Sequence, residues 1–273
     1  MQEIIKACDK VGAQYKIIDE KGNALEVISG VNRYLFIQAS PPLNSTSAVT
    51  LSVDKDFTYK VFKDHLNMPR SKAYLDPFCN EDFRYQAEFD SHSEIVDDIE
   101  KEFAYPVIVK MNRGRQGNNV FLCKNKEDIT NAVDNIFNRG SSNYDYVLLG
   151  QEYVDIKHEY RVIWYKGEVL FVYEKIADNK NESLSPFHNE NSKAVNIEDV
   201  VLKDRIVGCL NKANLESIFE FLGIDVVIDQ NDNMFILELN TKPGFYYFIR
   251  DNGDKKVVEM YEKIISEICH QNT

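Results

Sequence analysis

Counting along a β-hairpin near the C-terminal end places three oxygen-bearing side chains on one surface. GIDVVID and MFILELN are expected to form two strands joined by a QNDN turn. If Asp229 lies opposite Met234, counting back places Asp225 opposite Glu238, with Cβ atoms about 5 Å apart. Asn240 then points to the same face. Two carboxylates this close repel each other unless a cation lies between them, and an oxygen-only set suits Mg²⁺. Solvated acidic residues on an exposed sheet face are the alternative.

A second group of residues could bind phosphate. Lys110 ends the apolar strand YPVIVK and precedes the polar loop MNRGRQGNN, in which Arg113 lies beside Gly114 and Gly117. Flexible backbone amides and cations together can cradle phosphates. The loop matches neither a Walker A motif nor a dinucleotide fingerprint, so an ordinary surface hairpin loop stays open. Lys55, in DKDFT, is a further cation, and a solvated lysine in the first turn of a helix is its alternative.

Charged residues also alternate along a strand in the middle of the chain. Glu159 and Arg161, in EYRV, share one face of that strand. Arg161 could pair with a phosphate and Glu159 could accept hydrogen bonds from ribose hydroxyls, but charged cross-strand pairing explains both equally well. Near the C-terminus, Arg250 could hold a carboxylate of a substrate or form a surface salt bridge. The five histidines lack metal or triad spacing, and no motif indicates a covalent nucleophile.

Hydrophobic periodicity predicts the elements that must position these residues. Helices are expected at residues 3–11, from a cap at Asp54 to Pro69, after Asn125 and after Asp254. Residues 76–103 are acidic and weakly patterned, and residues 177–199 are expected to form a long loop. The expected strands are QYKIID, ALEVIS, VNRYLFIQ, YPVIVK, VFLC, YVLLGQEYV, EYRVIWY, EVLFVYEK, GIDVVID and MFILELN.

Composition narrows the class of protein. The 273 residues are 44% hydrophobic, which is enough for a sizeable core and excludes intrinsic disorder. The formal net charge of −12 disfavours nucleic acid and anionic membrane surfaces as partners. The five cysteines are odd in number and widely spaced, which indicates reduced thiols and a cytoplasmic location. No apolar run approaches the roughly 20 residues of a membrane span, and the charged start is unlike a signal peptide.

The order of these motifs resembles the ATP-grasp superfamily of carboxylate-amine ligases, over most of the chain. GIDVVIDQNDNMFILELNTKPGF resembles its metal-binding hairpin, YPVIVK with the following loop resembles its phosphate-gripping lysine and lid, and DKDFTYKVFKDHLNMPRSKAY resembles the preceding helix. Both ends of the chain are similar to the ATP-grasp part of cyanophycin synthetases and bifunctional glutathione synthetases. ADNKNESLSPFHNE departs from the usual Gly-Asp-Gly stretch of the family.

The resemblance implies an α+β fold of the ATP-grasp type. We expect a reduced N-terminal α/β unit at residues 1–53, and a linking helix with a small lid subdomain at 54–150. A C-terminal antiparallel core with the metal site is expected at 151–273. ATP would lie between the sheets of the last two parts.

The resemblance also implies roles for individual residues. Asp225, Glu238 and Asn240 would hold Mg²⁺, with Mn²⁺ as a possible substitute, and Lys110 and Arg161 would act in catalysis. The backbone of Gln151 to Val154 would meet adenine. The full set of expected nucleotide-binding residues is Lys55, Lys110, Arg113, Gly114, Gly117, Gln151, Glu152, Tyr153, Val154, Glu159 and Lys175.

The implied reaction forms an amide bond. A substrate carboxylate attacks the γ-phosphate of ATP to give an acylphosphate and ADP, and an amine then displaces phosphate. An amino acid or a short peptide is the expected substrate of a free-standing enzyme. A second copy of the chain, in a homo-oligomer, stays open as a partner. A phosphotransferase acting on a hydroxyl acceptor and a nucleotide-binding pseudoenzyme are the alternatives.

Overall fold

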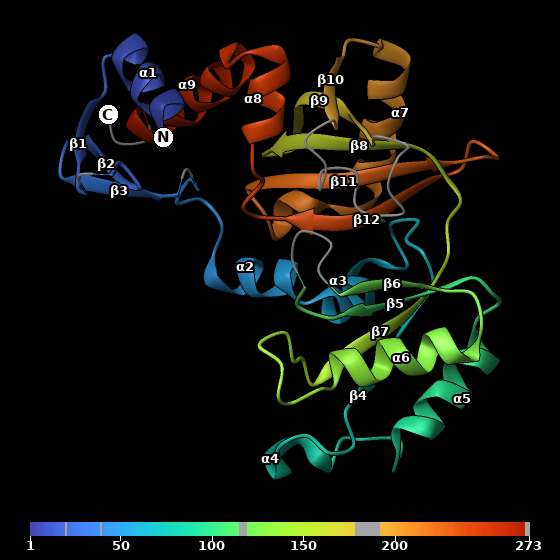
Figure 1. The fold of residues 1–273 in the computed structure, drawn as a ribbon. Helices are drawn as coiled ribbons and strands as arrows, with labels where there is room; N and C mark the ends of the chain where they lie inside the picture. Colours follow the sequence, from blue (N-terminus) through green and yellow to red (C-terminus); the bar gives the residue numbers. More distant parts are fainter. Residues whose placement is uncertain (20, 39, 115–118, 178–191, 271–273) are drawn as a thin grey trace.

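The computed structural model describes residues 1–19, 21–38, 40–114, 119–177 and 192–270, and within them it forms a mixed α/β fold with three antiparallel sheets. Figure 1 shows the five-stranded sheet stacked over the four-stranded sheet, with the small three-stranded sheet to one side. The strand orders are β10-β9-β8-β11-β12, β4-β7-β5-β6 and β1-β2-β3. The α+β architecture expected from the sequence is therefore confirmed.

The five-stranded sheet is covered on both faces, which explains why all nine residues of its inner strand β11, between β8 and β12, are buried. One face packs against α1, α8 and α9 in a cluster that includes Phe171, Phe221 and Ile264. The other face packs against α7 and residues 213–219, with Val172 and Leu222 in the contact. The elements are β8 (Ile156–Tyr165), β9 (Glu168–Ile176), β10 (Lys193–Ile197), β11 (Phe221–Asp229), β12 (Met234–Asn240), α7 (Val200–Leu210), α8 (Tyr246–Asn252) and α9 (Lys255–His270), with short 3-10 turns at Asn211–Ala213 and Leu215–Ser217.

The four-stranded sheet forms a separate core with two helices on one face (Figure 1). Its elements are β4 (Ser71–Leu75), β5 (Val107–Met111), β6 (Val120–Cys123), β7 (Val147–Glu152), α5 (His92–Glu102) and α6 (Lys126–Ile136), with a single turn at α4 (Glu81–Arg84). Helix α5 lies in the stretch that appeared weakly patterned. Ser91 caps it by accepting from the Glu94 N–H, and Ile95, Val96 and Ile99 are buried.

The N-terminal part joins the five-stranded core through α9. Helix α1 (Gln2–Val11) packs on α9, and β1 (Gln14–Ile17), β2 (Ala24–Ser29) and β3 (Asn32–Ile37) extend this cluster. Helix α2 (Thr46–Val53) leads to α3 (Lys55–Phe62), which Asp54 caps as expected. Helix α3 ends at Phe62, so the expected end at Pro69 is wrong.

Strands β10 and β7 lie where the sequence led us to expect a loop and a domain boundary. Strand β10 lies within residues 177–199, so that stretch is not a loop throughout. Strand β7 runs from Val147 to Glu152, across the expected boundary between residues 150 and 151. The division into three parts stays a prediction. Within the described residues, no helix combines the length and the apolar character needed to cross a membrane.

Candidate active site

The β11–β12 hairpin brings Asp225 directly opposite Glu238, as the sequence predicted. The expected route to this pairing was wrong, because Met234 faces Ile228 and not Asp229. The register then shifts by one residue next to Asp225, where a β-bulge at Leu237 separates two pairs of the ladder. The bulge restores the predicted pairing.

The bulge also decides which side chains face the site. A strand alternates its faces residue by residue, so an extra residue moves everything after it to the other face. Met234 and Ile236 are buried before the bulge and Leu239 is buried after it, a spacing of two and then three. Glu238 and Asn240 therefore point to the opposite face of the sheet. On that face Asn240 Nδ2 donates to Asp225 Oδ2 at 3.3 Å.

Asp225 lies in a buried network of alternating charges on this face. Arg161 donates to both of its carboxylate oxygens, with Nε to Oδ1 at 2.7 Å and Nη2 to Oδ2 at 3.0 Å. Lys175 Nζ lies between two carboxylates, at 2.5 Å from Asp225 and 2.7 Å from Glu159. Strands β8, β9 and β11 pair side by side, so this cluster is fixed by the register of the sheet.

Burial and charge compete in setting the pKa values of this network. Burial disfavours the charged form of Asp225, but Arg161 and Lys175 hold its pKa below the usual range. Burial raises the pKa of Glu159, and Lys175 offsets this effect only in part. The pKa of Lys175 is raised despite its burial, chiefly because of Asp225. The network is therefore stable as a set of mutual counter-ions.

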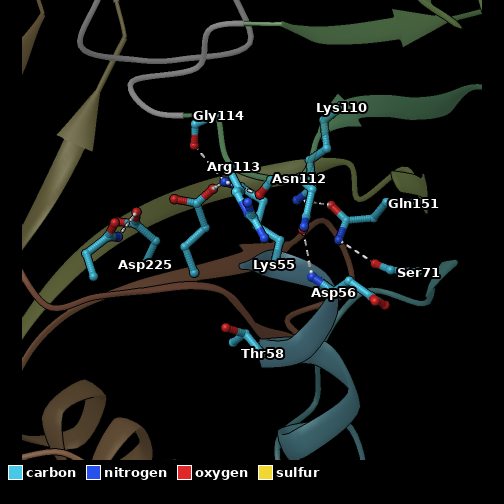
Figure 2. Close-up of polar contacts among 12 residues, drawn as sticks. Lys55, Asp56, Thr58, Ser71, Lys110, Asn112, Arg113, Gly114, Gln151 and Asp225 are labelled. Carbon is cyan, nitrogen blue, oxygen red and sulfur yellow. Dashed lines mark hydrogen bonds and ion pairs between the residues drawn. The ribbon is translucent and has the colours of Figure 1, made fainter. Parts of the chain in front are cut away.

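Two lysines enter the site from outside the five-stranded sheet (Figure 2). Lys110, on β5, is buried and donates to Gln151 Oε1 at 3.0 Å. Its pKa is lowered to about 8 by burial, an effect that Glu238 opposes and Lys55 reinforces. Lys55, in the first turn of α3, forms an ion pair of 3.4 Å with Glu238 and donates to the carbonyl of Gly114 at 2.7 Å. Lys55 thus connects the metal-ligand candidates with the loop after β5.

A pocket that opens to solvent lies at this junction. Cations and apolar side chains share its wall, as an aromatic base with an anionic tail would require. The lining consists of Ser52, Lys55, Thr58, Tyr59, Met68, Ser71, Lys110, Leu149, Gln151, Leu237, Glu238 and Leu239.

The loop after β5 is anchored at its beginning. The backbone N–H of Arg113 donates to Asp145 Oδ2 at 2.9 Å, its side chain pairs with Asp54 at 3.4 Å, and its guanidinium lies over the ring of Tyr146. Arg113 and Gly114 thus border the site. Gly117 lies outside the described residues.

The four residues expected to meet adenine differ in their surroundings. Gln151 is buried and lines the cavity, and its Nε2 donates to Ser71 at 2.7 Å. Glu152 exchanges backbone and side-chain hydrogen bonds with the backbone of Arg70. Tyr153 and Val154 follow the end of β7 and are not part of the cavity lining.

Sequence reasoning missed some polar residues and left one alternative to be decided. Asn112 is buried, and its Oδ1 accepts from the Asp56 N–H at 3.0 Å, which fixes the start of α3 against β5 (Figure 2). The sequence feature that could have identified Asn112 is its position, two residues after Lys110 on the same strand and loop. Arg250 pairs with Asp251 at 2.6 Å and donates to the carbonyl of Ser192. Because Arg250 already has these two partners, the structure favours a surface salt bridge over the binding of a substrate carboxylate.

The oxygen atoms around Asp225 fit a hard divalent cation. No group of three or more His, Cys, Asp and Glu side chains among the described residues is arranged to hold a metal ion. The candidate set differs from such groups because its third member is Asn240, whose Nδ2 faces Asp225 here and whose amide oxygen would turn toward a bound ion. Two carboxylates and an amide leave positions for water and phosphate, which Mg²⁺ normally retains.

Fold and site together define an ATP-grasp protein. The profile of the RimK-like ATP-grasp domain matches residues 79–267, and the chain belongs to this family.

Similar proteins agree with this assignment. The chain is 26% identical to coenzyme gamma-F420-2:alpha-L-glutamate ligase of Methanocaldococcus jannaschii, over 62% of this chain and 56% of that protein. It is 24% identical to human (Homo sapiens) N-acetylaspartylglutamate synthase A, over 76% of this chain and 47% of that protein. The structure of a bifunctional glutathione synthetase from Pasteurella multocida matches with a TM-score of 0.58 at 15% identity, covering 97% of this chain and 44% of that one. The chain thus spans about half the length of the curated relatives it matches.

Proposed function

We propose that this protein is an ATP-dependent carboxylate-amine ligase that forms an amide bond through an acylphosphate. The observation that carries the proposal is the convergence of four cations, Lys55, Lys110, Arg161 and Lys175, on the face that holds the proposed oxygen ligands of β11 and β12. Phosphoryl transfer requires alignment and neutralisation of charge more than a protein nucleophile. A set of cations beside hard oxygen ligands meets that requirement.

Each residue has a defined task in this proposal. Lys110 and Lys55 bind phosphate oxygens from the side of β5 and α3, and Arg161 and Lys175 bind them from the sheet. Asp225, Glu238 and Asn240 would hold Mg²⁺, which when bound would neutralise charge on the transferred phosphate. Arg161 and Lys110 act in catalysis by stabilising charge that develops in the transition state. Gln151 positions Lys110, and the backbone of residues 151–154 lies where adenine is proposed to bind.

The substrate class we propose is an amino acid or a short peptide. Two of the similar proteins carry glutamate in their names, which supports an amino acid as the amine. The five cysteines are free thiols, which supports the cytoplasm as the compartment.

Product analysis tests the proposal. The protein is incubated with Mg-ATP and pairs of amino acids or short peptides. ADP release is measured, and the masses of the products are determined by mass spectrometry. We expect ADP release that needs both an acid and an amine, with a product that has lost one water relative to the two substrates. A phosphorylated hydroxyl compound as the product would contradict the proposal and indicate a phosphotransferase.

A further inference from the structure

Asp225, a proposed metal ligand, has its charge matched by protein cations. Arg161 donates to both oxygens and Lys175 donates to Oδ1. A buried carboxylate with two cationic partners has little remaining attraction for a divalent ion, because an incoming ion must displace a partner that is already in place. The free energy of metal binding therefore includes the cost of separating these pairs.

In the wider site, too, the carboxylates are matched by protein cations. Lys55, Lys110, Arg161 and Lys175 face the carboxylates of Glu159, Asp225 and Glu238, which gives a local formal charge of +1 in a chain of net charge −12. A positive site disfavours a free divalent cation and favours a polyphosphate anion. Once a triphosphate is present, the local charge becomes negative and a divalent ion is attracted.

We propose that Arg161 and Lys175 are exchangeable counter-ions of Asp225, so that a divalent ion enters this site only together with a nucleotide. The inference rests on the nucleotide site proposed above. In the loaded site, Arg161 and Lys175 turn to phosphate oxygens, and Asp225 is released to coordinate the ion. Each charge exchanges one partner for another.

The position of Lys175 makes this exchange feasible. Its Nζ contacts Glu159 at 2.7 Å as well as Asp225 at 2.5 Å. When Lys175 leaves Asp225, it keeps Glu159 as a partner and gains phosphate, so no buried charge is left uncompensated. Leaving a buried charge without a partner is strongly destabilising. Glu159 is thus a positioning residue that holds Lys175 within reach of both Asp225 and the phosphate oxygens.

Binding of Mn²⁺, a spectroscopically visible substitute for Mg²⁺, tests the inference without any turnover. Protein-bound Mn²⁺ is measured by electron paramagnetic resonance and ultrafiltration, with and without a non-hydrolysable ATP analogue. We expect the affinity of the protein for Mn²⁺ to be at least about tenfold higher with the analogue. Equal affinity in both conditions would overturn the inference while leaving the nucleotide site intact. Absence of protein-bound Mn²⁺ even with the analogue would instead overturn the site on which the inference rests.

A variant gives a second readout that a merely structural role would not produce. Lys175→Met should raise the affinity for free Mn²⁺ about tenfold in the absence of nucleotide, because Asp225 loses one of its two counter-ions. Lys193→Met is the matched control, since it removes one exposed positive charge from the same sheet and should leave the affinity unchanged. An affinity of Lys175→Met equal to or below that of the wild type would contradict the exchange. If this variant fails to fold, the wild-type comparison still decides.

Discussion

At the scale of single residues, Glu238 combines partial exposure with a direct link to Lys55. Its side chain is 36% exposed, and the ion pair with Lys55 measures 3.4 Å. Pairs with this much exposure contribute little to folding, so removing the charge should affect the site more than the fold.

Glu238→Gln tests this separation. We expect ADP release to be abolished, because the metal site loses one of its two carboxylates, while the free energy of unfolding changes by no more than about 1 kcal/mol. Steady-state ADP release and chemical denaturation measure the two quantities. Near-normal turnover in this variant would contradict the assignment of Glu238 as a metal ligand.

Lys110 predicts a pH dependence of nucleotide binding. Its pKa is lowered to about 8, mainly by burial, so the free protein loses this charge as the pH rises through that value. Phosphate binding requires the charged form. The affinity for an ATP analogue should therefore be constant below about pH 8 and fall above it, by at most about tenfold per pH unit.

Titration calorimetry between neutral and alkaline pH measures this dependence. Lys110→Met should bind more weakly at neutral pH and should lack the fall, whereas Lys124→Met, which changes an exposed lysine at the end of β6, should behave as the wild type. A wild-type affinity that does not change across pH 8 would show that Lys110 does not contact phosphate.

At the scale of elements, the hairpin shows what sequence patterns can and cannot predict. Counting along the hairpin, together with residue types that suit a cation, predicted Asp225, Glu238 and Asn240 as one set. Simple alternation could not predict the bulge at Leu237, although the buried positions Met234, Ile236 and Leu239 carry its signal. A one-residue change of register reverses every side chain, so the pattern of burial must be read together with the turn.

Helices that lack a strong pattern were missed for physical reasons. Helix α2 buries only Ala48 fully, and α5 lies within a stretch dominated by charge. Both depend on capping serines, Ser45 and Ser91, and on tertiary contacts. Local caps are visible in the sequence, whereas the contacts that select among them are not.

Glycine 223 connects the site to the segment that follows β12. A Cβ at Gly223 would lie 2.5 Å from the Cβ of Pro243 and 3.2 Å from Arg161 Nη1. Gly223→Ala should therefore destabilise the protein by about 1 to 3 kcal/mol and weaken nucleotide binding, because either Pro243 or Arg161 must move.

Gly208→Ala is the matched control for this variant. Gly208 lies within helix α7, and a Cβ there would meet nothing within 4 Å. This change should stabilise the protein by about 0.5 to 1 kcal/mol, because alanine favours the helix. Denaturant unfolding of both variants checks the prediction, and equal effects of the two would contradict the close approach at Gly223.

At the scale of the whole molecule, the site lies where three parts of the chain meet. The five-stranded sheet supplies the proposed oxygen ligands together with Arg161 and Lys175, the four-stranded sheet supplies Lys110, and α3 supplies Lys55. The order of motifs along the chain predicted this assembly and the fold. It did not predict which cations would neutralise Asp225, because that depends on the register of three neighbouring strands.

Transfer of isotope from the substrate is the most direct test of an acylphosphate ligase. An acid that supports ADP release is labelled with ¹⁸O in its carboxylate, and the inorganic phosphate formed is analysed by mass spectrometry. When the carboxylate attacks the γ-phosphate and the amine then expels phosphate, the C–O bond breaks and one carboxylate oxygen leaves with phosphorus. We predict inorganic phosphate that carries one ¹⁸O atom for each amide formed. Unlabelled phosphate, with both ¹⁸O atoms retained by the acid or its product, would contradict the mechanism.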